Sequence, residues 1–197
     1  MGQYVPARIV DNDELAAIMD TSDDWIQAHT GIKTRHYAMN DENTSDLATQ
    51  VAQQLLQKSG LDTRTIDLIL VTTITPDALT PATACLVQAN IGADNAFAFD
   101  LSAACAGFTF GLATADKFIR SGQYQNVMVI SAEVNSKMMD FQDRTAAVFF
   151  GDGAGGALLQ ATTDPDENSI IAEKLQSQGN ATVIHSGRVR PITEVAA

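Results

Sequence analysis

The chain has 197 residues, of which 45% are hydrophobic and 18% charged, as in a soluble globular protein with one domain or two small ones. Its net charge of −12 argues against a nucleic-acid partner, because phosphate binding needs a basic face and the sequence has no cluster of Lys and Arg. No apolar run approaches the roughly 20 residues of a membrane span, and the first ten residues lack a secretory signal. We therefore expect a cytoplasmic protein that does not enter a membrane.

The first third of the chain is predicted to be mainly helical. Residues 11–19 and 22–28 have helical patterns, the second capped by Ser22 or by the threonine before it and stopped by the Thr-Gly pair that follows. Residues 45–58 carry apolar side chains every three or four positions, and Gly60 marks the end of this helix.

Short apolar runs alternate with helices in the rest of the chain. The predicted strands are 66–74, 96–101, 127–132, 146–150 and 154–161, and the predicted helices are 81–90, with Pro81 in its first turn, and 105–121. This alternation predicts an α/β class with a mostly parallel central sheet and an antiparallel hairpin at its end.

The predicted hairpin turns at a glycine-rich segment, residues 151–156. This segment superficially resembles a phosphate-binding loop, but it lacks the Lys-Ser/Thr pair and does not open a helix, so a structural turn is the preferred interpretation. From about residue 162 the sequence becomes polar, and we expect a poorly packed tail with one edge strand at 170–175.

The two cysteines, Cys85 and Cys105, form neither a CxxC pair nor a disulfide framework. No metal site is expected, because the three histidines, His29, His36 and His185, show no ligand spacing. The cysteines are therefore assessed for nucleophilic chemistry instead.

Cys105 is the candidate nucleophile. It follows a predicted strand, lies among small residues in the run DLSAACAGF (100–108) and opens a predicted helix. A helix amino terminus carries about half a positive charge, which favours the nucleophilic thiolate, and the exposed backbone N–H groups could contribute to an oxyanion hole. From position alone, a buried small apolar residue remains the alternative, and for Cys85, which lacks this setting, that is the preferred interpretation.

Four segments together resemble the N-terminal half of the β-ketoacyl-acyl carrier protein synthase III family. They are DTSDDWIQAHTGI (20–32), TITPDALTPATACLVQ (73–88), DLSAACAGFTFGL (100–112) and DRTAAVFFGDGAGGALL (143–159), in the family's order. The resemblance covers residues 4–161. It implies a thiolase-like α/β half-domain over 1–161, with a mixed, mostly parallel sheet packed by helices, followed by a polar, weakly matching tail over 162–197.

The resemblance implies an acyltransferase that initiates fatty acid synthesis. In the family, a cysteine accepts an acyl group from acyl-CoA and passes it to a carbanion formed by decarboxylation of malonyl-acyl carrier protein. Cys105 stands at the position of that cysteine. The CoA thioester is then a substrate, and no cofactor is expected.

Trp25 and Arg144 match the two residues that stack on opposite faces of the CoA adenine in this family. An indole and a guanidinium both present flat faces, so the pair is chemically suited to that task. Without the resemblance, the alternatives are an apolar helix anchor for Trp25 and a solvated surface charge for Arg144.

Two positions depart from the family's pattern. His29 stands where an arginine often contacts CoA phosphate, so this contact would be weaker and dependent on pH; an ordinary loop histidine is the alternative. Thr80 stands in the region that the family uses to close the acyl tunnel across the dimer, where a larger phenylalanine is often found. We therefore expect room for a starter acyl group longer than acetyl.

The family's catalytic histidine and asparagine belong to a second half that this sequence does not contain, and His185 matches neither of them. Three explanations are open: a truncated piece, a subunit completed by a separate C-terminal half, or a degenerate protein that only binds. The resemblance also implies an acyl carrier protein partner, whose acidic surface would need a basic dock elsewhere, and a homodimer formed through residues 93–101. Alternative functions are a related synthase, of the hydroxymethylglutaryl-CoA type or of secondary metabolism, and a non-catalytic acyl- or protein-binding fragment.

Overall fold

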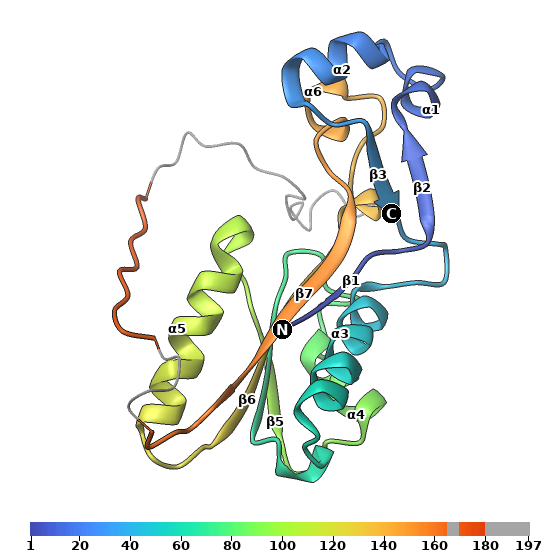
Figure 1. Ribbon diagram of the computed structural model, residues 1–197. Coiled ribbons are helices and arrows are strands. Elements are labelled where there is room, and N and C mark those ends of the chain that lie inside the picture. Colours follow the sequence, from blue (N-terminus) through green and yellow to red (C-terminus); the bar gives the residue numbers. More distant parts are fainter. Residues whose placement is uncertain (165–169, 180–197) are drawn as a thin grey trace, which may run out of the picture.

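A mixed five-stranded sheet forms the centre of the computed structural model, which describes residues 1–164 and 170–179 (Figure 1). In spatial order its strands are β1 (Gly2–Tyr4), β7 (Asp152–Gln160), β6 (Asn126–Val134), β4 (Leu68–Thr72) and β5 (Phe97–Leu101). Strand β4 pairs in parallel with β5 and β6, whereas β7 runs antiparallel to β6 and β1. The predicted α/β class with a mixed sheet is therefore confirmed.

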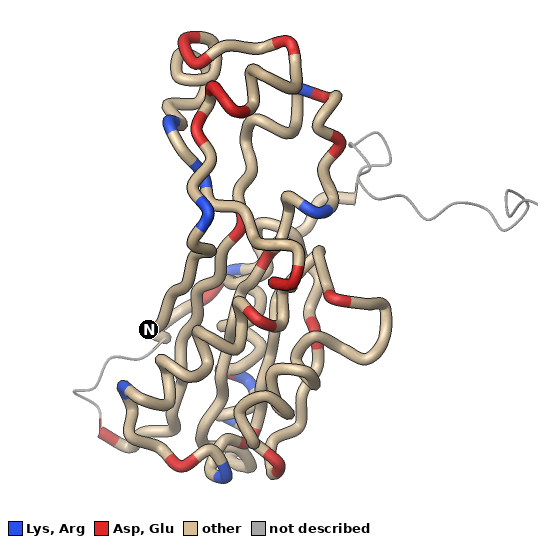
Figure 2. The backbone as a smooth tube through the Cα atoms, turned by 90° about the vertical axis from the view of Figure 1, so that its right-hand side faces the viewer, with Lys and Arg blue, Asp and Glu red and all other residues tan. Residues whose placement is uncertain are grey.

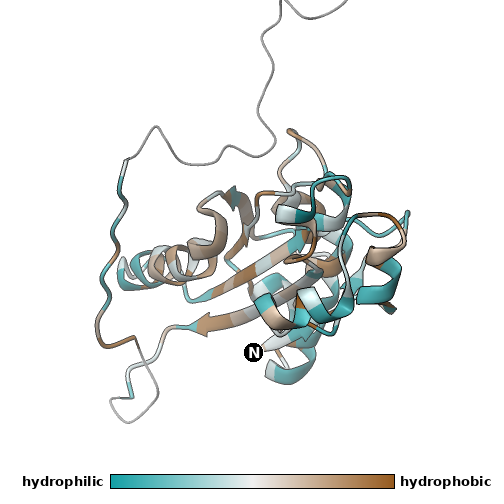
Figure 3. Cartoon of the chain, turned by 90° about the horizontal axis from the view of Figure 1, so that it is seen from above, coloured by the Kyte–Doolittle hydropathy of each residue, from teal (hydrophilic) through white to brown (hydrophobic). Residues whose placement is uncertain are grey.

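Helices cover both faces of this sheet. Helices α3 (Thr44–Ser59) and α4 (Thr83–Ile91) lie on one face and α5 (Gly107–Arg120) on the other (Figure 1). Successive strand residues point to opposite faces, so Ile69 packs toward α3 and α4 while Leu68 packs toward α5. Both side chains are fully buried. Figure 3 shows the resulting layer of apolar strands between the helices.

Local signals set the ends of the helices as predicted. The Asp46 carboxylate accepts a hydrogen bond of 2.8 Å from the Asn43 N–H at the start of α3. Gly60 ends the helix in the left-handed conformation, with φ 70°, which glycine adopts without steric cost. The helix predicted at 45–58 is thus confirmed, with one more residue at each end.

A smaller unit, the cap cluster, lies at one end of the sheet, at the top of Figure 1. It consists of strands β2 (Arg8–Asp11) and β3 (Thr34–Tyr37) and helices α1 (Asn12–Ala16), α2 (Asp23–Thr30) and α6 (Arg144–Ala147). Its buried residues are Val10, Leu15, Met19, Ile26, Tyr37, Ala147 and Val148. Helix α2 begins after Ser22, whose hydroxyl accepts the Trp25 N–H at 3.1 Å, and ends at Gly31 with φ 72°, as predicted.

Three short 3₁₀ turns complete the regular structure of the described residues: η1 (Thr63–Thr65), η2 (Ala104–Ala106) and η3 (Asn135–Lys137).

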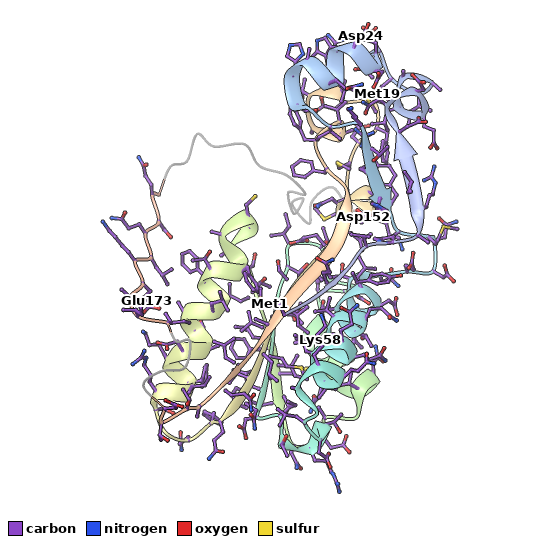
Figure 4. The ribbon with its side chains drawn as sticks, in the orientation of Figure 1. Met1, Met19, Asp24, Lys58, Asp152 and Glu173 are labelled. Atoms are coloured by element: carbon purple, nitrogen blue, oxygen red, sulfur yellow. The ribbon has the colours of Figure 1, made fainter. Side chains whose placement is uncertain are left out.

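The predicted strand at 146–150 and the hairpin after it are wrong. Residues 144–147 form α6, and Asp152 and Gly153 already belong to β7, which pairs with β6 and β1. The Asp152 carboxylate accepts hydrogen bonds from the Ala38 N–H at 2.7 Å and from the N–H and hydroxyl of Ser136. It thereby fixes the start of β7 where this strand leaves the cap cluster, the position labelled in Figure 4.

Two further predictions also need correction. Pro81 precedes α4, which begins at Thr83, because Asp100 accepts the Thr83 and Ala84 N–H groups and sets the helix start there. Residues 170–175 form no strand. His185 lies outside the described residues, so only part of the polar tail at 162–197 is described.

Acidic residues are distributed over both the cap cluster and the opposite end of the sheet (Figure 2). In the part of the chain that the structure describes, no helix is both long and apolar enough to cross a membrane.

Candidate active site

Cys105 lies exposed in the elbow that joins β5 to α5. The predicted helix begins slightly later than expected, because Cys105 belongs to the 3₁₀ turn η2 and α5 starts at Gly107. Ala104 has φ 46°, a left-handed conformation that is uncommon for a residue other than glycine. Such strained strand-to-helix turns expose a nucleophile at a fixed position.

Two glycines of α5 hold the elbow close to the sheet. A Cβ on Gly107 would lie 3.1 Å from the Cβ of Thr72, and a Cβ on Gly111 would lie 2.8 Å from Cγ1 of Val129 and 2.9 Å from Cγ2 of Thr72. Only glycine permits this approach without displacing buried strand residues. The start of α5 is therefore fixed against the carboxyl end of β4, and its second turn against the middle of β6.

The loop after β4, residues 73–82, borders the same elbow. Its first residue, Thr73, donates its N–H to the carbonyl of Leu101 at 3.2 Å, and Leu101 ends β5 four residues before Cys105. At the far end of the loop, the Asp100 carboxylate accepts the Thr83 N–H at 2.7 Å. The carboxyl ends of parallel strands are where ligands bind in open α/β sheets, so this edge is the natural place for a site.

Thr80 lies in this loop and is exposed, as is the neighbouring Leu79, whose side chain is 98% accessible. The structure therefore brings the segment that carries Thr80 to the edge of the sheet that carries Cys105.

Trp25, His29 and Arg144 come together on the cap cluster. The rings of Trp25 and His29 stack with centroids 4.2 Å apart and an interplanar angle of 20°, and Nδ1 of His29 lies 2.8 Å from the Trp25 carbonyl oxygen. The Arg144 guanidinium carbon lies 5.6 Å from the centroid of the indole. Trp25 is half-buried, whereas His29 and Arg144 are exposed.

Arg144 is the first residue of helix α6, directly after the residue that caps this helix, Asp143. The Asp143 carboxylate accepts hydrogen bonds from the hydroxyl and the N–H of Thr145, and these bonds lower the pKa of Asp143. Arg144 donates to the Asp20 carbonyl at 2.6 Å and lies 3.5 Å from the Asp20 carboxylate. The Asp143 cap and the contacts of Arg144 with Asp20 thus hold the guanidinium beside the indole.

The amino end of α5 and the cap cluster lie at the same end of the sheet (Figure 1). The structure therefore gathers the candidate nucleophile and the three candidate CoA contacts at one end of the molecule. Sequence reasoning missed the carboxylates that build this end, Glu133 and Asp100; the available signal was an acidic residue at or near the carboxyl end of a buried strand.

Solved structures share this fold. A 3-oxoacyl-[acyl-carrier-protein] synthase III from Aquifex aeolicus is 45% identical with a TM-score of 0.80, over 83% of this chain and 53% of that one. The priming β-ketosynthase of the R1128 polyketide biosynthetic pathway is 37% identical with a TM-score of 0.80, over 83% of this chain and 49% of that one. The sheet and the cysteine elbow accordingly define a thiolase-like α/β protein.

Sequence comparisons narrow this class. The family model for 3-oxoacyl-[acyl-carrier-protein (ACP)] synthase III matches residues 99–179. The β-ketoacyl-[acyl-carrier-protein] synthase III 1 of Lactiplantibacillus plantarum is 94% identical over the whole chain, which covers 61% of that protein. The synthase III of Streptococcus agalactiae is 53% identical over 189 residues, which are 96% of this chain and 57% of that protein. The chain is thus similar to the N-terminal part of these β-ketoacyl-[acyl-carrier-protein] synthases III, and it spans about 60% of their length.

Proposed function

We propose that this chain supplies the acyl-loading site of an enzyme that initiates fatty acid synthesis. The single observation that carries the proposal is the exposed Cys105 in a strained elbow at the carboxyl ends of parallel strands. The Cys105 thiolate attacks the thioester carbonyl of an acyl-CoA, a new C–S bond forms, and CoA leaves as a thiolate that takes up a proton. The acyl group then passes to the carbanion left by decarboxylation of malonyl-acyl carrier protein.

Trp25 and Arg144 are proposed to hold the adenine of CoA. Their mutual distance of 5.6 Å and the flat faces of both groups support this role. His29 is proposed as a further CoA contact, because its ring already stacks on Trp25. A histidine ring N–H can donate a hydrogen bond to a phosphate oxygen.

Thr80 is proposed to line the acyl pocket, with space for a starter longer than acetyl. Its support is the position of its loop, which joins the end of β5 through the bond from Thr73 to Leu101. Proposed partners are acyl-CoA, an acyl carrier protein, and a second copy of the chain or a completing C-terminal half. The proposed location is the cytoplasm.

The acyl-loading step is tested by incubating the chain with acetyl-CoA and butyryl-CoA and measuring its intact mass. We expect the mass to rise by one acyl group, the adduct to map to Cys105, and Cys105→Ala to remain unmodified. Cys85→Ala is the matched control, because Cys85 is half-buried in α4 with its Sγ 3.6 Å from the Ala98 carbonyl oxygen, and it should load normally. An unmodified wild-type chain would overturn the proposal.

A second candidate function is the priming of polyketide synthesis. It is favoured by the 37% identity to the R1128 priming ketosynthase over 83% of this chain. Both functions share acyl loading on the cysteine, so the acyl donor that loads Cys105 fastest distinguishes them.

A further inference from the structure

Glu133 joins the end of β6 to the residues that follow β4. Its Oε1 accepts the Ile74 N–H at 2.9 Å. Its Oε2 accepts the Thr75 N–H at 3.1 Å, the Thr75 hydroxyl at 2.6 Å and the Thr73 hydroxyl at 3.1 Å. One carboxylate therefore binds three consecutive residues of the neighbouring loop.

The middle of this arrangement is buried. Thr75 is 6% exposed, and its hydroxyl donates to Glu133 while accepting the Val134 N–H at 2.9 Å. Hydrogen bonds to an ionised carboxylate are shorter and stronger than those between neutral groups. The first three residues after β4 are therefore held firmly to the end of β6.

Glu133 holds the first residues of the loop 73–82, which is bound to the end of β5 four residues before Cys105. The loop starts at Thr73, which is also bound to Leu101 at the end of β5, and it ends where Asp100 caps α4. Thr80 lies between these two fixed ends. A change in backbone direction at residues 73–75 would therefore move the segment that carries Thr80 relative to the elbow.

We propose that Glu133 is a positioning residue that sets which acyl groups Cys105 accepts, by holding the 73–82 loop. This inference rests on the proposed acyl loading. Glu133 acts through Thr73, Ile74 and Thr75 and does not touch the substrate itself.

The decisive variant is Glu133→Gln, which keeps the size of the side chain. A glutamine amide has one acceptor oxygen and an NH2 group that only donates. The NH2 group therefore cannot accept the hydrogen bonds that one of the two Glu133 oxygens accepts. The second variant, Thr75→Val, removes the hydroxyl that bridges Glu133 and Val134 and leaves the carboxylate intact.

Asp67 offers a matched control at the opposite end of the same strands. Its Oδ2 accepts the N–H groups of Gln125 at 2.7 Å and Asn126 at 2.9 Å, just before β6. Asp67→Asn therefore loosens a carboxylate–backbone contact of the same kind, far from the carboxyl ends that carry Cys105.

The experiment measures rates of Cys105 acylation by acetyl-, butyryl-, isobutyryl- and hexanoyl-CoA, followed by intact mass. We expect Glu133→Gln and Thr75→Val to change the ratio of hexanoyl to acetyl rates by about tenfold, as for a lost hydrogen bond to a charged group. Asp67→Asn should keep the wild-type ratio.

Three outcomes would overturn the inference. An unchanged ratio in Glu133→Gln, with the wild type acylated, refutes it and leaves the proposed function standing. An equal change in Asp67→Asn refutes it as well, because the effect would then be general loosening. A wild type that no acyl-CoA modifies refutes the proposed function and the inference together. If circular dichroism shows Glu133→Gln unfolded, Thr75→Val decides the question on the same ratio.

Discussion

At Trp25, two other side chains already occupy the space where an adenine would stack. His29 stacks on the ring at 4.2 Å, and the Arg144 guanidinium carbon lies 5.6 Å from its centroid. An adenine between the indole and the guanidinium needs about 7 Å, twice a contact distance of about 3.5 Å. For adenine to stack as proposed, Arg144 has to move outward when CoA binds. This movement breaks the exposed ion pair of Arg144 with Asp20, and such pairs contribute little, together with the hydrogen bond of 2.6 Å to the Asp20 carbonyl.

Replacing Arg144 by lysine tests the stacking separately from the charge. Lysine keeps the positive charge but has no planar face to stack on the adenine, so Arg144→Lys should weaken the proposed contact by about 0.5–1 kcal/mol. We expect the acyl-CoA concentration for half-maximal acylation of Cys105 to rise about two- to fivefold, with an unchanged rate at saturation. Arg64→Lys, at an exposed arginine paired with Asp62, is the control. Equal affinities in the wild type and Arg144→Lys would contradict the clamp.

At the scale of elements, the contact between α5 and the sheet determines where the elbow lies. Gly111 is the closest point, since an added Cβ would lie 2.8 Å from Val129 and 2.9 Å from Thr72. Both neighbours are buried β-branched residues with stiff side chains, so they cannot move aside cheaply.

Gly111→Ala should therefore destabilise the chain. Overpacking costs about 1–3 kcal/mol, which outweighs the gain of up to about 1 kcal/mol in helix propensity. We expect a lower urea midpoint and slower acylation of Cys105, because α5 shifts away from the strand ends. Thr109→Ala, at an exposed position of the same helix, should leave both unchanged. A stabilised Gly111→Ala would show that the sheet yields at this point.

Elements with strong local signals could be predicted from the sequence. The apolar stripe and Gly60 defined α3, and the apolar runs defined β4, β5 and β6. The strand predicted at 146–150 is wrong because a short apolar run fits a strand and a buried helical turn equally well. The cap at Asp143 favours the helix α6. Strands β2 and β3 were missed because each has only four residues.

In the candidate site, too, residues with a strong local sequence signal could be named from the sequence, and residues without one could not. Cys105, Trp25 and Arg144 could be named as candidates, because each is a distinctive residue inside a recognisable motif, and their roles stay predictions. Glu133 could not, because an acidic residue after a strand is common, and its partners at residues 73–75 become neighbours only through the parallel pairing of β4 and β6.

At the scale of the whole molecule, β5 is an edge strand of the five-stranded sheet. Phe97 on this strand is 36% exposed and forms an aromatic cluster with Phe99, Phe118 and Tyr124, with ring centroids 5.1–6.3 Å from Phe97. An edge strand with exposed aromatic surface is a template for pairing with a second chain.

We therefore expect the chain to self-associate through β5. Phe97→Lys places a charge on this edge and should reduce the mass measured by light scattering from that of a dimer to that of a monomer. Phe149→Lys, at a phenylalanine of 48% exposure outside the sheet, should leave the dimer intact. A wild-type chain that is monomeric at all concentrations would refute the expectation.

The pairing of β1 with β7 has a consequence for the order of events during synthesis. Gly2 pairs with Gly156, so β1 lacks this partner until β7, about 150 residues later in the chain, has left the ribosome. At about 5–20 residues per second, this wait lasts on the order of 10–30 seconds. Throughout that interval, the inner side of α3 that will receive Gly2, including Val51, lacks its cover. The pairing of β1 with β7 therefore forms late, and a chaperone that shields apolar surface has that interval in which to act.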